Sequence, residues 1–473
     1  MIDVFAQDAL TAAINRSRVL IPTAVDALCD VIAEVTGKVP NRSRVEYVSM
    51  HWLMHACDIY VYDSGEPRNA REREVDIFTT GAPTRRAKML AMVGSQRASI
   101  VVTEPYLKSG IRDEIRAAAQ SRRWLRWSAS PTTGIAVAPP DSARRQSTAT
   151  GSVGAHGSRD DLRAVIALTA PVELVELHHH FASWAKTGVN PDLRLVFTAN
   201  AQQSSVAFRY WSFEQRQLGT RLAIQQHGGS YGIDERHLGE DLDIWSGDVF
   251  YTWGWERPDL GSRVRPLPTA TPRRAKRADR ASYLLISIHV TSHFYRLQSF
   301  LIPSQIERAI DETAAFTSGL STAAPLVMRS SAVHPFPMHR LGQHHVKMSL
   351  DDQTQPGPLA ASRHALVIHN YLGTSWLETL AMNIPTVCFY DPRTYRPRDA
   401  ARPFIDELAR VGVVHHSGAD AAAFVNRLNG NPRSWWKSAE VQAAREAFVA
   451  RYANFSDNWL DAWQEEFERL LAE

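Results

Sequence analysis

Short apolar runs recur between residues 195 and 390, and longer stretches of mixed polarity separate them. The first group of runs reads LVFT, RLAI and VFYT, and the second group reads YLLI, LVMR, LVIH and TVCF. Runs of this length that are rich in β-branched residues are typical of buried strands, and their alternation with helices indicates parallel pairing. The pattern therefore predicts an α/β fold with two parallel sheets.

A Pro- and Arg-rich connection at residues 258–280 separates the two groups of runs. We therefore expect an N-terminal α/β domain over residues 1–265, helical at its beginning, and a C-terminal Rossmann-like domain over residues 281–440. Residues 128–160 are rich in Ser, Gly, Pro and Thr and bury little apolar surface, so they predict a mobile loop. The last segment, 441–473, is expected to be helical and to pack back towards the N-terminal domain.

Charge and composition narrow the function classes. The 473 residues include 53 basic and 50 acidic side chains, a net charge of +3 that does not indicate a nucleic-acid partner. Three widely spaced cysteines indicate neither a disulfide framework nor a zinc site, so we expect a reducing compartment. The chain begins without a signal-peptide pattern and contains no apolar run of about 18 residues, which predicts a cytoplasmic protein. The basic run at residues 272–280 is a solvated linker, or a patch for peripheral binding to anionic lipids at the inner face of the membrane.

The segment QQHGGSYG, residues 225–232, follows a predicted strand and contains candidate site residues. Gly228 and Gly229 let the backbone turn or let another molecule come close. His227 changes charge near neutral pH and is a candidate for proton transfer. Carboxylates that could serve as general base or nucleophile follow shortly after the strand: Asp234, Glu240 and Asp241. The sequence leaves open whether His227 or one of these carboxylates moves the proton.

A second candidate site is the turn between the predicted strand ALVI and the helix WLETLAMN. Gly373, Thr374 and Ser375 would present backbone N–H groups, hydroxyls and the positive end of the helix dipole to a phosphate. Ser375 and Glu378 also match a capping box, which needs no ligand but is compatible with one, so Glu378 joins the candidate donor-binding residues. Because ligands of parallel sheets bind beyond the carboxyl ends of strands, we expect a phosphate site at this turn.

Several of these segments together resemble a family of bacterial surface-polysaccharide transferases. The matching pieces cover roughly residues 190–455 and read VFTAN, QHGGSYG, TWGW, SWLETLAMNIPT and RDAARPFIDELARVGVVHHS. The block around residues 374–392 is also similar to the donor-binding half of GT-B glycosyltransferases. The resemblance implies two Rossmann-like domains whose sheets face a central cleft. It implies an enzyme of O-antigen (lipopolysaccharide) or capsule synthesis that uses a nucleotide-sugar donor and a glycan or lipid-linked glycan acceptor.

GT-B enzymes that use CMP-activated ulosonic acids, such as sialyltransferases and β-Kdo transferases, contain a His-Pro motif and a hydroxyl-rich turn that hold the cytidine phosphate. By this resemblance His334 and Pro335 would grip CMP, and Arg329 would be a charge partner. The chain has His227-Gly228 where those enzymes often have an Asp-Gly motif. The resemblance favours a CMP-Kdo-like donor and leaves retention or inversion open. The alternatives are a UDP- or dTDP-sugar, a CDP-polyol donor, or a non-catalytic nucleotide-binding protein.

We expect neither a further cofactor nor a metal. The single phosphate of a CMP donor can be stabilised by a helix dipole and side chains. Asp241-x-Asp243 matches the metal motif of GT-A enzymes, whereas the C-terminal half resembles GT-B. The three consecutive histidines 178–180 would point about 100° apart on a helix and so cannot share one ion.

Overall fold

The computed structural model describes residues 22–62, 99–104, 125–127, 140–150, 158–235, 237–272, 282–289, 303–330, 336–341 and 347–473. These residues form two compact units. The first unit takes in the described residues up to 224 together with 242–248, and the second takes in 225–241 and 249–473. The division therefore falls at the end of a strand near residue 224, and not near residue 265 as the sequence suggested.

The first unit is built on a parallel sheet with the strand order β2-β1-β3-β4. Ile100 of β1 lies opposite Leu195 of β3, which in turn lies opposite Arg221 of β4. A short helix, α8, and the longer α9 connect β3 to β4, as expected of a parallel crossover. The elements are β1 (Ile100–Thr103), β2 (Leu125–Trp127), β3 (Leu195–Thr198), α8 (Ala201–Ser204), α9 (Val206–Gln217) and β4 (Arg221–Gln225).

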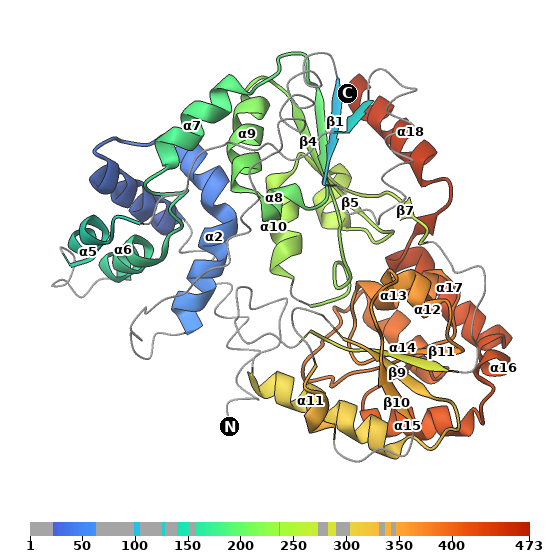
Figure 1. Cartoon of the computed structure of the whole chain (residues 1–473). Helices are drawn as coiled ribbons and strands as arrows, with labels where there is room; N and C mark the ends of the chain where they lie inside the picture. The colour runs from blue at the N-terminus through green and yellow to red at the C-terminus, as the bar shows by residue number, and fades with distance from the viewer. Residues whose placement is uncertain are drawn as a thin grey trace. The chain divides into compact units, whose positions relative to one another are not determined.

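Helices predominate in the described residues up to 187 of this unit. Residues 22–36 are helical, and they are followed by α2 (Arg42–Tyr62), α5 (Ser142–Thr150), α6 (Ser158–Thr169) and α7 (His178–Thr187) (Figure 1). One apolar cluster joins these helices through side chains such as Leu28, Ile32, Val45 and Ile166. His178 on α7 is buried, and its Nδ1 lies 2.8 Å from the Tyr210 hydroxyl, so it packs within the protein.

The prediction of a mobile loop over residues 128–160 is wrong for the part that the structure describes. Residues 142–150 form α5, and α6 begins at Ser158. Arg145 explains how so polar a segment packs: its buried guanidinium pairs with Glu176 and donates to the carbonyl of Ala170. A buried arginine with its partners supplies the anchoring that an apolar residue would otherwise supply.

The second unit contains a six-stranded parallel sheet with the order β10-β9-β8-β11-β12-β13. Strands are added on one side of β8 as far as β10, and then the chain crosses to the other side and continues with β11. The carboxyl ends of β8 and β11 therefore flank a topological switch point. The strands are β8 (Tyr283–Ile286), β9 (Leu326–Arg329), β10 (Met348–Leu350), β11 (Leu366–His369), β12 (Thr386–Phe389) and β13 (Val414–His415).

Both faces of this sheet are apolar, which explains the uninterrupted apolar runs in the sequence. Tyr283, Leu285 and their neighbours on one face pack with α11 (Pro303–Gly319) and α15 (Gly418–Arg427). Leu284 and Ile286 point to the other face and pack near Ala361 of α12 (Gly357–Ala361). Figure 1 shows helices on both sides of the sheet, with α13 (Thr374–Ala381) among them. The predicted α/β class with parallel sheets is confirmed.

The second unit also includes residues 249–270 because the C-terminal helices hold this segment. The Tyr251 hydroxyl donates to Glu466 at 2.7 Å, and Trp463 Nε1 donates to the carbonyl of Pro268 at 2.8 Å. Trp253 packs on Phe455 with ring centroids 5.1 Å apart. The remaining elements are α10 (Leu238–Ser246), β5 (Val249–Thr252), η2 (Pro258–Arg263), β6 (Val264–Pro266), β7 (Thr269–Ala270), η3 (Met338–Arg340), α14 (Arg402–Arg410), α16 (Pro432–Trp436), α17 (Ala439–Tyr452), β14 (Phe455–Ser456) and α18 (Trp459–Ala472).

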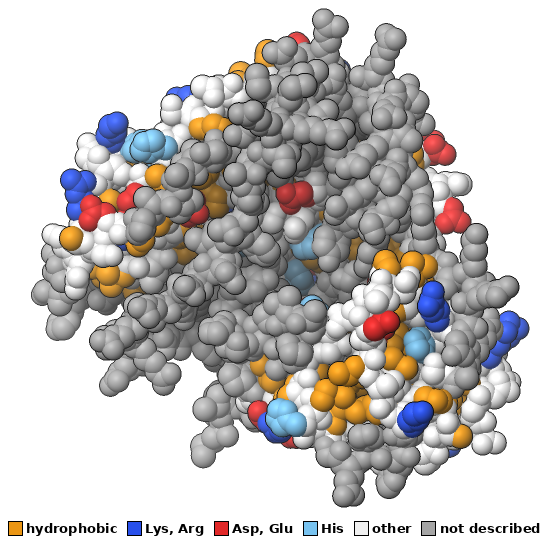
Figure 2. Space-filling view, viewed as in Figure 1, with side chains coloured by type: hydrophobic (Ala, Val, Ile, Leu, Met, Phe, Trp, Pro, Cys, Tyr) orange, Lys and Arg blue, Asp and Glu red, His pale blue; other side chains and the backbone are white. Residues whose placement is uncertain are grey.

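Helix hydrophobicity and the distribution of basic side chains bear on binding to membranes and nucleic acids. Among the described residues, no helix has the length and apolar character needed to cross a membrane. On the face drawn in Figure 2, the described Lys and Arg side chains are mostly separated from one another by uncharged side chains.

Candidate functional site

A buried asparagine organises the switch point of the second sheet. Asn370 directly follows β11, and its Oδ1 accepts a hydrogen bond from the N–H of Ile288, just beyond β8, at 2.7 Å. Its Nδ2 donates to the hydroxyl of Thr313 on α11 at 2.9 Å. One side chain thus joins the ends of both strands to α11 and fixes the loops from which a ligand site would be built.

Helix α13 begins immediately after this point. Its N-cap is Gly373, with φ −131° and ψ −174°, and no side chain caps the helix. A Cβ at Gly373 would overlap the ring of Tyr371, so the close ring favours glycine at the N-cap. Ser375 is consequently the second residue of the helix, where its hydroxyl lies 3.1 Å from that of Tyr371. The capping box predicted for Ser375 and Glu378 is therefore wrong, and Glu378 is buried within the helix.

The glycine pair of QQHGGSYG contacts the start of α13. The N–H of Gly229 donates to Thr374 Oγ1 at 2.9 Å. A Cβ at Gly229 would lie 2.5 Å from the carbonyl carbon of Gly373 and 2.7 Å from the nitrogen of Thr374. A Cβ at Gly228 would lie 3.2 Å from Thr374 Oγ1. Both glycines let the backbone approach closely, and the partner is the chain's own turn at residues 373–374. The two turns singled out in the sequence therefore lie together inside the second unit.

His227 is held on the same turn by a buried tyrosine. Its Nδ1 lies 3.2 Å from the hydroxyl of Tyr231, and the two rings meet edge to face with centroids 5.3 Å apart. Tyr231 itself stacks on Phe250 and lies against His237, with centroid distances of 5.9 and 4.2 Å. A packed phenol of this kind restrains the orientation of the imidazole ring, and His227 itself is half-buried.

Glu240 is buried and pairs with Arg398. Its side chain is only 2% exposed and accepts the N–H of Gly232 at 2.8 Å. Two N–H groups of Arg398 donate to its two carboxylate oxygens at 3.1 and 2.9 Å. Because these bonds engage both oxygens of a buried carboxylate, Glu240 is unsuited to act as nucleophile or base.

Asp241 and Asp243 point away from each other. Both lie on α10, and residues two positions apart on a helix point roughly 200° away from each other. Asp243 is buried in the first unit, where Gln203 Nε2 donates to its Oδ2 at 2.9 Å. Among the described residues, no group of three His, Cys, Asp or Glu side chains is arranged to hold a metal ion.

Asp234 has a raised pKa. Burial raises its pKa from 3.8 to about 7, against the opposing effects of a hydrogen bond from Ser230 and the charge of Arg398. Its Oδ1 is buried and has no hydrogen-bond partner among the described residues. The raised pKa brings the titration of this carboxyl towards neutral pH, because burial disfavours its charged form.

Of the remaining predicted donor-binding residues, the structure describes only Arg329. Arg329, at the end of β9, pairs with Asp351, and its Nη2 donates to the carbonyl of Gln355 at 2.9 Å. Its charge is therefore balanced within the protein. His334 and Pro335 lie outside the residues that the structure describes.

Sequence reasoning missed three residues that organise this site: Asn370, Tyr231 and Arg398. Tyr231 lies within the segment QQHGGSYG, where an aromatic residue between glycines was an available signal. Asn370 directly follows an apolar run, which marks a strand end but not its partners. Arg398 stands in an arginine-rich segment without any local pattern.

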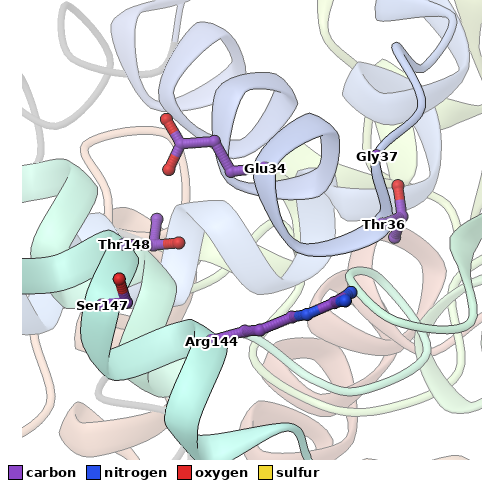
Figure 3. Close-up of a pocket in the computed structure, with 6 residues that line it drawn as sticks. All are labelled: Glu34, Thr36, Gly37, Arg144, Ser147 and Thr148. Carbon is purple, nitrogen blue, oxygen red and sulfur yellow. The ribbon is translucent and has the colours of Figure 1, made fainter.

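A shallow pocket lies in the helical part of the first unit (Figure 3). Its two charged side chains have partners within the protein. Arg144 Nη1 donates a hydrogen bond to the carbonyl of Val35 at 2.7 Å, and Glu34 forms an ion pair with Arg163. We therefore assign no ligand to it. The lining residues are Glu34, Thr36, Gly37, Arg144, Ser147 and Thr148.

Similarity to known proteins is found among solved structures and protein families. Comparison with curated proteins finds no match. Similar solved structures include the spinosyn forosaminyltransferase SpnP, with 11% identity and TM-score 0.40 over 80% of this chain and 100% of that chain. The spinosyn rhamnosyltransferase SpnG shares 12% identity with a TM-score of 0.35, over 78% of this chain and 100% of that chain. The glycosyltransferase SnogD from Streptomyces nogalater shares 12% identity with a TM-score of 0.34, over 79% of this chain and 99% of that chain. These scores are too low to support an argument. A family model described as LIC12162 family transferase matches residues 65–467, and the chain therefore belongs to this transferase family.

Proposed function

We propose that the chain is a GT-B glycosyltransferase that transfers a CMP-activated ulosonic acid, such as Kdo, to a glycan acceptor during synthesis of a bacterial surface polysaccharide. The observation that carries this proposal is the contact between the turn at residues 227–229 and the start of α13, next to the switch point of a Rossmann-like sheet. The turn predicted to bind phosphate and the histidine predicted to transfer a proton thus lie on neighbouring segments. The transferase family and the sequence resemblance support the same reading.

The donor phosphate would lie at the first turn of α13. The positive end of the helix dipole stabilises an anion there. Thr374 accepts the N–H of Gly229, and a hydroxyl that accepts a hydrogen bond still has its own hydrogen to donate. Phosphate held by these groups needs no metal, so EDTA should leave activity intact. A complete loss that Mn²⁺ restores would instead favour a metal-dependent enzyme.

His227 is the residue that we assign to proton transfer. The acceptor hydroxyl would lose its proton to His227 while its oxygen forms a bond to the anomeric carbon. The bond from that carbon to the phosphate oxygen breaks, and CMP leaves with the electron pair. This single displacement inverts the anomeric centre. A carboxylate nucleophile would give retention, and intact-mass detection of a sugar adduct on Asp234 or Asp241 would identify it.

We place this enzyme in the cytoplasm, with peripheral attachment to the inner face of the membrane where lipid-linked acceptors are found. The basic segment at residues 272–280 supports this attachment because anionic lipids attract clustered Lys and Arg. Cosedimentation with anionic vesicles in low and high salt tests it. Equal partitioning at both salt concentrations would contradict an electrostatic attachment.

A nucleotide panel measured by thermal shift identifies the donor class. CMP at about 100 times its Kd should stabilise the protein by about 2.7 kcal/mol, and UMP, dTMP and AMP at equal concentration should stabilise it much less. Preferential stabilisation by UDP or dTDP would move the donor to a UDP- or dTDP-sugar, and stabilisation by CDP would favour a CDP-polyol. CMP binding without turnover of any CMP-linked sugar would indicate a non-catalytic nucleotide-binding protein.

A further inference from the structure

Residues 233–235 are joined by backbone bonds to a distant segment of the second unit. Asp234 and Pro397 form an antiparallel bridge. The N–H of Arg398 donates to the carbonyl of Ile233 at 2.7 Å, and the N–H of Glu235 donates to the carbonyl of Arg396 at 2.8 Å. The segment after β12 therefore fixes the course of the chain just beyond the turn that carries His227.

The side chain of Arg398 extends this connection. Its Nε donates to the carbonyl of Asp234 at 3.0 Å, and its two terminal nitrogens donate to Glu240. Glu240 in turn accepts the N–H of Gly232. The guanidinium also lies over the ring of Trp255, 5.6 Å from its centroid. One arginine and one glutamate thus fasten the chain just beyond the turn at two backbone positions, residues 232 and 234.

Stability alone does not account for such a pair. The side chains of Arg398 and Glu240 are 19% and 2% exposed, and removing two charges from water offsets most of their attraction. A bidentate guanidinium–carboxylate pair does, however, fix orientation, because two parallel bonds allow a single geometry. The pair is therefore suited to specifying the position of the turn that it holds.

We propose that Arg398 and Glu240 are positioning residues that hold the turn at residues 227–229 against the start of α13, and so hold His227 in place for the transfer reaction. The inference rests on the proposed function for its effect on catalysis. Neither residue needs to touch the substrate. Because a displacement of about 1 Å can lower turnover about 100-fold, loosening the pair should lower kcat by about 10–100-fold. The KM for the donor should change by less than about threefold, because the groups of α13 stay in place.

Arg398→Lys and Glu240→Gln test this proposal, with Arg402→Lys as the matched control. Lysine keeps the charge and loses the bidentate geometry, and glutamine keeps one acceptor oxygen. Arg402 lies four residues after Arg398 and pairs at the surface with Asp399, where an exchange has little effect. If Glu240→Gln does not fold, Arg398→Lys carries the test, because Glu240 then keeps a positive partner.

Hydrogen–deuterium exchange of a peptide that covers residues 226–235 gives a readout independent of activity. We expect faster exchange of this peptide in both variants, unchanged exchange in the core strands of the sheet, and wild-type behaviour in the control. Unchanged exchange of the peptide, or wild-type kcat in a folded Arg398→Lys protein, would overturn the proposal. If the wild-type protein transfers no sugar at all, the proposed function fails, and the exchange experiment alone decides whether the pair positions the turn.

Discussion

Replacing Gly229 by alanine should disrupt the contact on which the candidate site depends. The new Cβ would lie 2.5 Å from the carbonyl carbon of Gly373, 2.7 Å from the nitrogen of Thr374 and 3.0 Å from the Cα of Gly373. Carbon atoms pack best at about 3.5–4.0 Å, so the two turns must separate by about 1 Å. All three neighbours are backbone atoms, so no side-chain rotation relieves the overlap.

Two terms set the size of the effect. Overpacking of this kind costs about 1–3 kcal/mol, and losing the hydrogen bond from Gly229 to Thr374 adds about 0.5–1.5 kcal/mol. We therefore expect Gly229→Ala to lower the free energy of unfolding by about 2–4 kcal/mol. The displaced turn should also lower turnover about 100-fold in the fraction that remains folded.

Urea denaturation followed by tryptophan fluorescence measures the stability change, and two further variants serve as controls. At Gly228 the close neighbour of a new Cβ among the described residues is Thr374 Oγ1 at 3.2 Å, a side-chain atom that can shift, so Gly228→Ala should cost less than about 1 kcal/mol. A Cβ at Gly357 meets no described atom within 4 Å beyond its chain neighbours, and Gly357→Ala should also cost less than about 1 kcal/mol, mainly because alanine before Pro358 disfavours the helical conformation. If Gly229→Ala were as stable and active as Gly357→Ala, the contact would be absent in solution and the reasoning would fail.

Three other substitutions test individual groups. His227→Ala should lower turnover by about 10²–10⁴-fold with little change in melting temperature, whereas activity that merely follows the folded fraction would indicate a structural role. Changing Thr374 and Ser375 together to alanine should weaken CMP binding by about 1–3 kcal/mol in calorimetry, and unchanged affinity in a folded protein would remove them from the donor site. Burial raises the pKa of Asp234 to about 7, so between about pH 4 and pH 7 the unfolded chain ionises this carboxyl while the folded protein keeps it protonated. Asp234→Asn should therefore gain stability relative to wild type across that window and show no gain at pH 4, and a difference independent of pH would contradict this assignment.

The sheets could be predicted from the sequence because their signal is local. Each strand of the second sheet is an apolar run, since both of its faces are covered by helices. The helix over residues 142–150 was missed for the opposite reason. Its anchor is a buried arginine, and a composition rich in Ser, Thr and Arg does not reveal the distant glutamate and carbonyl groups that bind that arginine.

The two turns of the candidate site were predicted from the sequence, but the contact between them was not. Both glycine turns were recognised from their composition, but Gly229 and Thr374 are 145 residues apart, and no local pattern shows that they touch. Arg398 and Glu240 are 158 residues apart, so Glu240 was interpreted as a free carboxylate beside a strand end. The capping box failed because the ring of Tyr371 favours glycine at the N-cap, a contact between near neighbours that the capping-box pattern does not include.

The release of CMP tests the central claim most directly. Purified protein is incubated with a CMP-activated ulosonic acid, with and without a glycan acceptor, and free CMP and the glycan product are measured by chromatography and mass spectrometry. Our account predicts acceptor-dependent release of CMP, with the acceptor gaining the mass of one ulosonic acid residue, and a large loss of both signals in His227→Ala. Absence of CMP release under these conditions, together with consumption of a UDP- or dTDP-sugar, would contradict it.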